Sequence, residues 1–203
     1  GLPIDQGVLS VIDEAGKTFS KLGAEVTLKD PPLEGAMECF QTQRAVGLRG
    51  LGNLLEKTIP NWREFAKDTA TWNIEKGFGL TIEDMIRAEA TRTRIFEDIS
   101  EYFRDFDALL LPAAQVPPFD LSQEWISEIE GIKLDTYIDW MSVCCMITVT
   151  GLPAISVPGG FTEEGLPVGI QLVGKPNGDL ELLKIANAYE AMTKHYARTP
   201  ELF

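Results

Sequence analysis

Two short apolar runs separated by a turn-forming segment constrain the fold most. Ala154 to Val157 and Val168 to Val173 have the composition of β-strands, and the residues between them are rich in Gly and Pro. This pattern predicts a hairpin or another close pairing of two strands. An amphipathic helix is expected from Asp179 to about His195, with apolar residues along one face: Leu182, Leu183, Ala186, Tyr189 and Met192. We therefore expect an α/β fold in which helices flank part of a mixed β-sheet.

The first residues have the pattern of a helix followed by a strand. Apolar side chains recur at helical spacing from Val8 to Leu22, Gly23 follows as a C-terminal stop, and Ala24 to Leu28 has strand composition. This is the second half of a β-α-β repeat without its first strand. Because the chain also begins with Gly1 rather than Met, we expect it to start inside a larger α/β fold.

A helical layer is predicted next. Three stretches favour helix, from about Glu34 to Glu56, from Trp62 to Lys76 and from Ile82 to Phe106. Thr81 is the expected N-cap of the third stretch, because Glu83 and Asp84 then fall in its first turn.

The segment after these helices alternates between buried and surface patterns. Asp107 to Leu111 predicts a buried strand that ends at a Pro-rich loop. The acidic stretch from Ser122 to Asp135 predicts a short surface helix and a turn at Gly131. Tyr137 to Thr148 favours helix over strand, although its Val, Ile and Thr content narrows the preference.

Composition limits the classes of partner. With 203 residues and 44% hydrophobic residues, the chain has the material for one domain, so we treat residues 1–203 as a single unit. A net charge of -13 argues against nucleic acid and anionic lipid as partners, because both are bound by clustered Lys and Arg. Three cysteines, Cys39, Cys144 and Cys145, cannot all pair within one chain, so a reducing, cytoplasmic setting is expected.

The C-terminal third carries a set of family motifs. GLPAISVP from Gly151, GLPVGIQLVG from Gly165 and the helix near Asp179 follow one another at intervals that resemble the C-terminal portion of amidase-signature enzymes. Upstream, DALLLPAAQVPPF from Asp107 is similar to the strand and Pro-rich loop of the same family. The resemblance covers nearly the whole chain and is weakest from about Glu34 to Gly79.

That resemblance implies hydrolysis of a carboxylic amide to an acid plus ammonia or amine. Family members use a serine nucleophile, a second serine on a cis peptide bond and a lysine base, together with backbone amides that stabilise the oxyanion. These groups belong to a Gly/Ser-rich segment of the family's N-terminal half, and the serines of this chain are instead scattered singly. We therefore predict a C-terminal half that lacks the catalytic half, is inactive alone, and contributes no catalytic residue.

Three residues are candidates for contact with a small-molecule amide substrate. Asp139 stands twelve residues before Gly151, where the glutamine-hydrolysing branch of the family places an acid that recognises an ammonium group, although Asp139 also suits a helix start. Gln115 follows a buried strand, at the end where α/β folds commonly bind ligands. Arg94 is placed either to face a substrate acid or to pair with an acidic residue on its own helix.

Other chemistry is disfavoured. His195, the only histidine, is expected to interact with the end of a helix rather than to serve in a Ser-His-Asp arrangement. One histidine and two vicinal cysteines do not supply a zinc spacing, so neither a metal site nor a cofactor is predicted. Glu124, Glu128 and Glu130 are interpreted as a solvated face, and GLRGLG from Gly47 to Gly52 as a helix break.

Two further functions stay open. The chain is either a non-catalytic module for assembly or ligand binding, or part of an A-type subunit of a glutamine-dependent amidotransferase. A sheet edge left uncovered by the other half of the fold also favours self-pairing, so a homodimer is one expected state.

Overall fold

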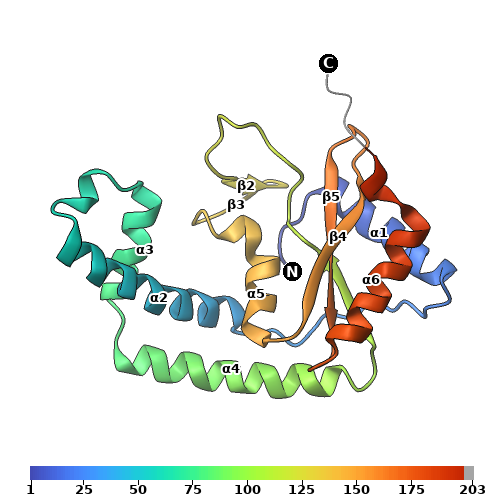
Figure 1. The fold of residues 1–203 in the computed structure, drawn as a ribbon, viewed down its shortest axis with the longest axis horizontal. Coiled ribbons are helices and arrows are strands. Elements are labelled where there is room, and N and C mark those ends of the chain that lie inside the picture. The colour runs from blue at the N-terminus through green and yellow to red at the C-terminus, as the bar shows by residue number, and fades with distance from the viewer. Residues whose placement is uncertain (199–203) are drawn as a thin grey trace.

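A computed structural model describes residues 1–198, and Figure 1 shows a small sheet with helices on both sides. The sheet has the strand order β1-β5-β4, with β1 at Ala108–Pro112, β4 at Ala154–Phe161 and β5 at Pro167–Gly174. Both pairings are antiparallel. The predicted α/β class is confirmed, as is the β4–β5 hairpin, but within residues 1–198 the sheet is antiparallel throughout and not the mixed sheet that was expected.

A glycine allows the hairpin to bend. The register between β4 and β5 shifts between Pro158 and Gly160, and a Cβ on Gly159 would lie only 2.4 Å from Cγ2 of Ile170. A β-bulge of this kind lets the strand curve over its neighbour.

Each face of the sheet supports its own apolar core. On one face, α1 (Gln6–Lys21) and α6 (Asp179–Thr193) cover a cluster that includes Val157, Ile170 and Tyr189. On the other face, Leu109 and Val173 pack into a second cluster built mainly by α2, α4 and α5. Burying both faces is what a short apolar sheet requires in water.

The N-terminal helix is confirmed and the strand after it is not. Asp5 caps α1, because its Oδ1 accepts hydrogen bonds from the main-chain N–H groups of Gly7 and Val8, and Gly23 has the left-handed φ of 94° expected after a helix. Residues 24–28 are irregular and exposed, so the predicted strand is wrong for the described residues. A strand composition forms a strand only where a neighbouring strand pairs with it, and none lies alongside here.

The helical layer consists of α2 (Ala36–Thr58), the short helix η1 (Trp62–Glu64), α3 (Asp68–Phe78) and α4 (Ile82–Tyr102). Thr81 and Asp84 form the reciprocal capping box at the start of α4, which confirms the predicted N-cap. The second predicted helix is divided into η1 and α3.

The predicted break at GLRGLG is wrong, because α2 runs through it without interruption. Gly52 is buried against α3, where a Cβ would lie 2.4 Å from Cγ2 of Ile74. Gly77 of α3 lies equally close to the backbone of α2, since a Cβ added at Gly77 would lie 2.4 Å from the carbonyl oxygen of Ala45. These two glycines therefore serve close helix packing.

The acidic segment forms a hairpin instead of the predicted surface helix. β2 (Glu128–Ile129) and β3 (Ile132–Lys133) pair across a turn in which Glu130 and Gly131 both have positive φ. The predicted turn at Gly131 is thus confirmed, but a two-residue turn of this conformation directs the chain back on itself and excludes a helix.

The last helices follow the predictions more closely. A short helix, η2 (Asp139–Met141), leads into α5 (Ser142–Thr150), which Gly151 ends in the left-handed conformation. In α6, Leu182, Ala186 and Tyr189 are buried as expected, whereas Leu183 and Met192 are exposed. A further short helix, η3 (His195–Ala197), follows α6. Among the described residues, no helix combines the length and apolar character needed to cross a bilayer.

Candidate functional site

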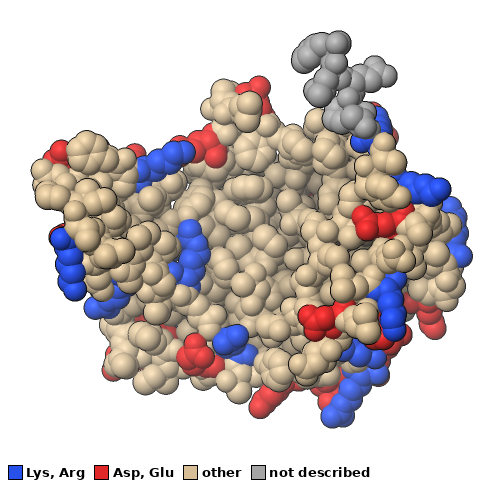
Figure 2. All heavy atoms as spheres, in the orientation of Figure 1, with Lys and Arg blue, Asp and Glu red and all other residues tan. Residues whose placement is uncertain are grey.

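The face shown in Figure 2 is hollowed in its middle, between the α2–α3 region and the sheet with its helices. Charged side chains gather mostly around the rim of this face, and the middle is mainly uncharged. Since α5 runs through this middle region, the residues around its first turn are candidates for ligand contact.

Asp139 lies directly before α5 as the first residue of η2, and it is partly exposed. Its Oδ2 accepts a hydrogen bond from the main-chain N–H of Thr136 at 2.7 Å. This is a local contact between side chain and backbone, and it does not cap η2, whose N-cap is Ile138. The second carboxylate oxygen, Oδ1, accepts no hydrogen bond from the described residues.

Gln115 is fully buried and uses both ends of its amide. Nε2 donates to the carbonyl of Pro3 at 2.9 Å, and Oε1 accepts from the main-chain N–H of Val143 at 3.2 Å. Because Val143 belongs to the first turn of α5, Gln115 joins the N-terminal segment to the start of that helix. The structure thus brings Gln115 and Asp139 to the same end of α5.

Arg94 lies elsewhere, on the exposed side of α4. Its Nη1 pairs with Asp98 at 3.1 Å, and its Nη2 donates to the carbonyl of Glu34 at 2.7 Å. The helical ion pair that the sequence allowed is therefore present, and the structure does not bring Arg94 together with the other two candidates.

Arg44, Asn73 and Tyr137 form a cluster that was not predicted from the sequence, and we call it the Arg44 cluster. Arg44 of α2 donates through Nη1 to Oδ1 of Asn73 in α3 and through Nη2 to the hydroxyl of Tyr137, just before η2. Asn73 is buried, although asparagine is a mostly exposed residue type. This polar residue on the buried side of a helix was the one signal in the sequence that pointed to the cluster.

Two buried polar atoms near α5 and in the sheet have no hydrogen-bond partner within residues 1–198: Nε1 of Trp140 and Oε1 of Gln171. A buried polar group without a partner costs about 1–3 kcal/mol. Gln171 stands opposite Ser156 in the sheet, and Ser156 is exposed. Both atoms are covered by residues of this chain itself.

The vicinal cysteines of α5 differ in their chemistry. The neighbouring Cys145 thiol lowers the pKa of Cys144 to about 7, while the Cys144 thiol itself donates to the main-chain carbonyl of Met141 at 3.0 Å. The Cys144 thiol, together with burial, raises the pKa of Cys145. Cys144 is partly exposed, so it is the more reactive thiol of the pair.

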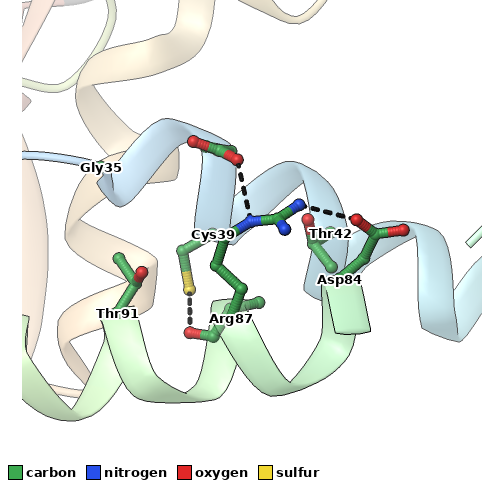
Figure 3. A pocket seen from close by; sticks show the side chains of 8 residues that line it. Gly35, Cys39, Thr42, Asp84, Arg87 and Thr91 are labelled. Atoms are coloured by element: carbon green, nitrogen blue, oxygen red, sulfur yellow. Dashed lines mark hydrogen bonds and ion pairs between the residues drawn. The ribbon is translucent and has the colours of Figure 1, made fainter. Parts of the chain in front are cut away.

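Cys39 lines a shallow hollow between α2 and α4 (Figure 3). Its thiol donates to the carbonyl of Ala88 at 3.2 Å, and burial raises its pKa. At the rim, Arg87 bridges Asp84 at 2.7 Å and Glu38 at 3.6 Å. The Cys39 thiol therefore stays un-ionised and does not provide a nucleophile. The exposed ion pairs around it join the two helices.

Several of the singly scattered serines, and His195, make structural contacts. The hydroxyls of Ser10, Ser20 and Ser100 donate to main-chain carbonyls one helical turn earlier. His195 opens η3 and lies edge-on to the ring of Phe161, with 6.1 Å between the ring centroids. Glu124 is exposed, and Glu128 and Glu130 lie in and beside the β2–β3 hairpin. Among the described residues, no group of three or more His, Cys, Asp or Glu side chains is arranged to hold a metal ion.

The sequence matches a family and many of its members. The family described as Amidase matches residues 3–183. The A-type subunit of the glutamyl-tRNA(Gln) amidotransferase of Myxococcus xanthus is 39% identical over 223 aligned positions, which span 98% of this chain and 44% of that protein. The corresponding protein of a Geobacter species is 34% identical over 97% of this chain and 44% of its own length.

Solved structures agree on the fold. A bacterial aryl acylamidase of the amidase signature family superimposes with a TM-score of 0.82 at 23% identity, over 97% of this chain and 42% of that one. The structure of a 6-aminohexanoate cyclic dimer hydrolase gives a TM-score of 0.80 at 19% identity, over 98% of this chain and 44% of that one. The chain therefore spans less than half the length of these relatives, and it belongs to the amidase signature family.

Proposed function

We propose that residues 1–203 form the C-terminal part of an amidase-signature hydrolase that converts a carboxylic amide to an acid plus ammonia or amine. The observation that carries the proposal is the family match over residues 3–183 in a chain that spans 44% of the length of a curated relative. Under this proposal, the serine nucleophile, the second serine and the lysine base come from the part of those relatives that this chain does not cover.

Exposed features of the sheet support an adjoining segment. Within the described residues, β4 pairs only with β5, so one edge of β4 presents main-chain groups without a strand beside it. A second copy of the chain is the alternative occupant of the β4 edge, which would give a homodimer.

The three substrate-contact predictions carry different weight under this proposal. Asp139 has one carboxylate oxygen free to bind an ammonium group, so it remains the best candidate. Gln115 has both amide ends occupied and would act by positioning the start of α5. Arg94 would first have to leave Asp98. The three cysteines are unpaired, which agrees with the cytoplasmic location that we propose.

The test is an amide-hydrolysis assay on two polypeptides: the chain of residues 1–203 alone and the gene product that contains it. Release of ammonia or amine should occur with a gene product that carries a Gly/Ser-rich segment with two serines and a lysine, and not with the 203 residues alone. Turnover by residues 1–203 that is lost in Ser156→Ala would contradict the proposal, because the nucleophile would then lie in this chain.

A second candidate is a role in an A-type subunit of a glutamine-dependent amidotransferase. It is favoured by the 39% identity to the Myxococcus protein over 98% of this chain. Glutamine hydrolysis that exceeds the hydrolysis of simple aliphatic and aryl amides, and that rises when partner proteins are added, would support it. If the gene product hydrolyses no amide at all, the non-catalytic module becomes the better interpretation.

A further inference from the structure

Three elements that are far apart in the sequence converge on the Arg44 cluster. Arg44 comes from α2, Asn73 from α3, and Tyr137 from the segment before η2. Asn73 uses both ends of its amide, because Oδ1 accepts from Arg44 while Nδ2 donates to the Tyr137 hydroxyl and to the carbonyl of Thr69. The asparagine therefore fixes the arginine and the tyrosine relative to each other.

The cluster has more hydrogen-bond donors than acceptors. A guanidinium carries five N–H donors, and Arg44 directs one to Asn73 and one to Tyr137. The Tyr137 oxygen already accepts from both Arg44 and Asn73, so its own O–H must donate elsewhere. No acceptor for that proton, or for the other Arg44 donors, lies among residues 1–198. Because Arg44 and Tyr137 are only partly buried, these remaining donors are open to water or to an anionic ligand.

The charge of Arg44 is also uncompensated. Within the described part of the chain, no carboxylate lies within ion-pairing distance of Arg44, whereas Arg63, Arg87 and Arg94 pair with acidic side chains at the surface. Arg44 is partly buried and bonds only to neutral groups. An arginine stays protonated, so a partly buried guanidinium is best stabilised by an anion.

The surroundings hold the cluster in place and add positive charge. The ring of Trp72 lies edge-on to Tyr137, with 6.1 Å between centroids, and the Lys76 ammonium lies 4.3 Å from the centroid of Trp72. Arg44 itself lies 5.6 Å from the centroid of the Tyr137 ring. The chain as a whole carries a charge of -13, so an anionic ligand needs a local cationic site of this kind.

We propose that the Arg44 cluster binds a carboxylate group of the substrate, with Arg44 and Tyr137 as donors and Asn73 as the positioning residue. A carboxylate has two acceptor oxygens, which match the free guanidinium N–H groups and the Tyr137 O–H. The inference rests on the proposed function and deepens it by naming the substrate class: amides that carry a carboxylate apart from the bond to be cleaved.

The experiment measures ammonia release by the gene product that contains residues 1–203. Each amide is supplied as an acid and as its methyl ester, for example glutaric acid monoamide and its ester. The acid form should be preferred, and Arg44→Met should raise its KM by about 10- to 100-fold, because hydrogen bonds to charged groups are worth about 1.5–3 kcal/mol. The KM of the ester should not change.

A matched variant and a milder one complete the design. Arg49→Met removes an exposed arginine from the same helix and should alter neither KM. Tyr137→Phe keeps the ring beside Trp72 but removes the O–H, so it should raise the KM of the acid form alone, by about 5- to 10-fold. This second variant decides the question if Arg44→Met fails to fold.

Failure of the inference and failure of the proposed function give different results. If acid and ester lose activity equally in Tyr137→Phe and Arg44→Met, the cluster is a structural contact and the inference is overturned while amide hydrolysis stands. If the gene product hydrolyses no amide, the proposed function fails, and calorimetry with glutarate then tests the site. Glutarate binding that is weakened by Arg44→Met or by Tyr137→Phe would support the carboxylate site. If the unaltered protein does not bind glutarate, the inference is overturned.

Discussion

Replacing Gly77 with Ala tests whether α2 and α3 are held together by direct backbone contact. The added Cβ would lie 2.4 Å from the carbonyl oxygen of Ala45 and 2.9 Å from the main-chain nitrogen of Arg49. Backbone atoms of a helix cannot rotate away as a side chain can, so the two helices must separate. Overpacking of this kind costs about 1–3 kcal/mol, against a gain of about 1 kcal/mol in helix propensity. We expect a net loss of up to roughly 2 kcal/mol.

Gly50→Ala is the matched control, because Gly50 lies in the same helical pair and a Cβ there would meet nothing within 4 Å. It should stabilise the protein by about 0.5–1 kcal/mol through helix propensity alone. Urea unfolding followed by circular dichroism measures both variants. If Gly77→Ala proves as stabilising as Gly50→Ala, the close approach of the two helices is not present in solution.

Three further outcomes are expected. Thr81→Ala should lower the free energy of unfolding by about 1 kcal/mol, because it removes the capping box of α4, and urea unfolding measures the loss. Tyr189→Phe should cost a similar amount of about 1 kcal/mol, since the hydroxyl donates to the buried carbonyl of Gly159 at 2.8 Å; an unchanged midpoint would mean that this bond is not formed. Iodoacetamide should label Cys144 with a rate that rises through about pH 7, because the thiolate forms above its lowered pKa, while Cys39 stays protonated and slow; mass spectrometry that finds the reverse order refutes the assignment.

Local sequence signals predicted the elements that depend on their own residues. The capping pattern at Thr81 and the apolar spacing of α6 depend on residues within a few turns of each other. The β4–β5 hairpin is also local, because a Gly- and Pro-containing turn joins two adjacent runs of strand composition. These elements could be found without knowledge of the rest of the fold.

The wrong predictions share a cause, which is that their outcome depends on distant residues. Ala24 to Leu28 has strand composition but no strand alongside it among the described residues. GLRGLG was interpreted as a helix break, but Gly52 is needed because Ile74 and Phe78 of α3 leave no room for a side chain at that position. The residues next to Gly52 in the sequence give no sign of this contact. A contact between two helices is decided by packing, which composition does not report.

The site was predicted in the same uneven way. Asp139 was expected at a helix start and lies there, whereas the Arg44 cluster was missed because it joins residues from three elements. Arg44 falls in the part of the chain where the family resemblance is weakest. Its importance emerges only when its hydrogen-bond partners, and the carboxylate that it lacks, are known.

We propose that residues 1–203 supply scaffold and substrate recognition, and that the nucleophile lies outside them. The most direct measurement is to react the active gene product with a fluorophosphonate, which forms a stable adduct with an activated serine, and to map the labelled peptide by mass spectrometry. We expect an adduct on a serine outside residues 1–203. An adduct on a serine within these residues, with parallel loss of activity, would place the nucleophile in this chain.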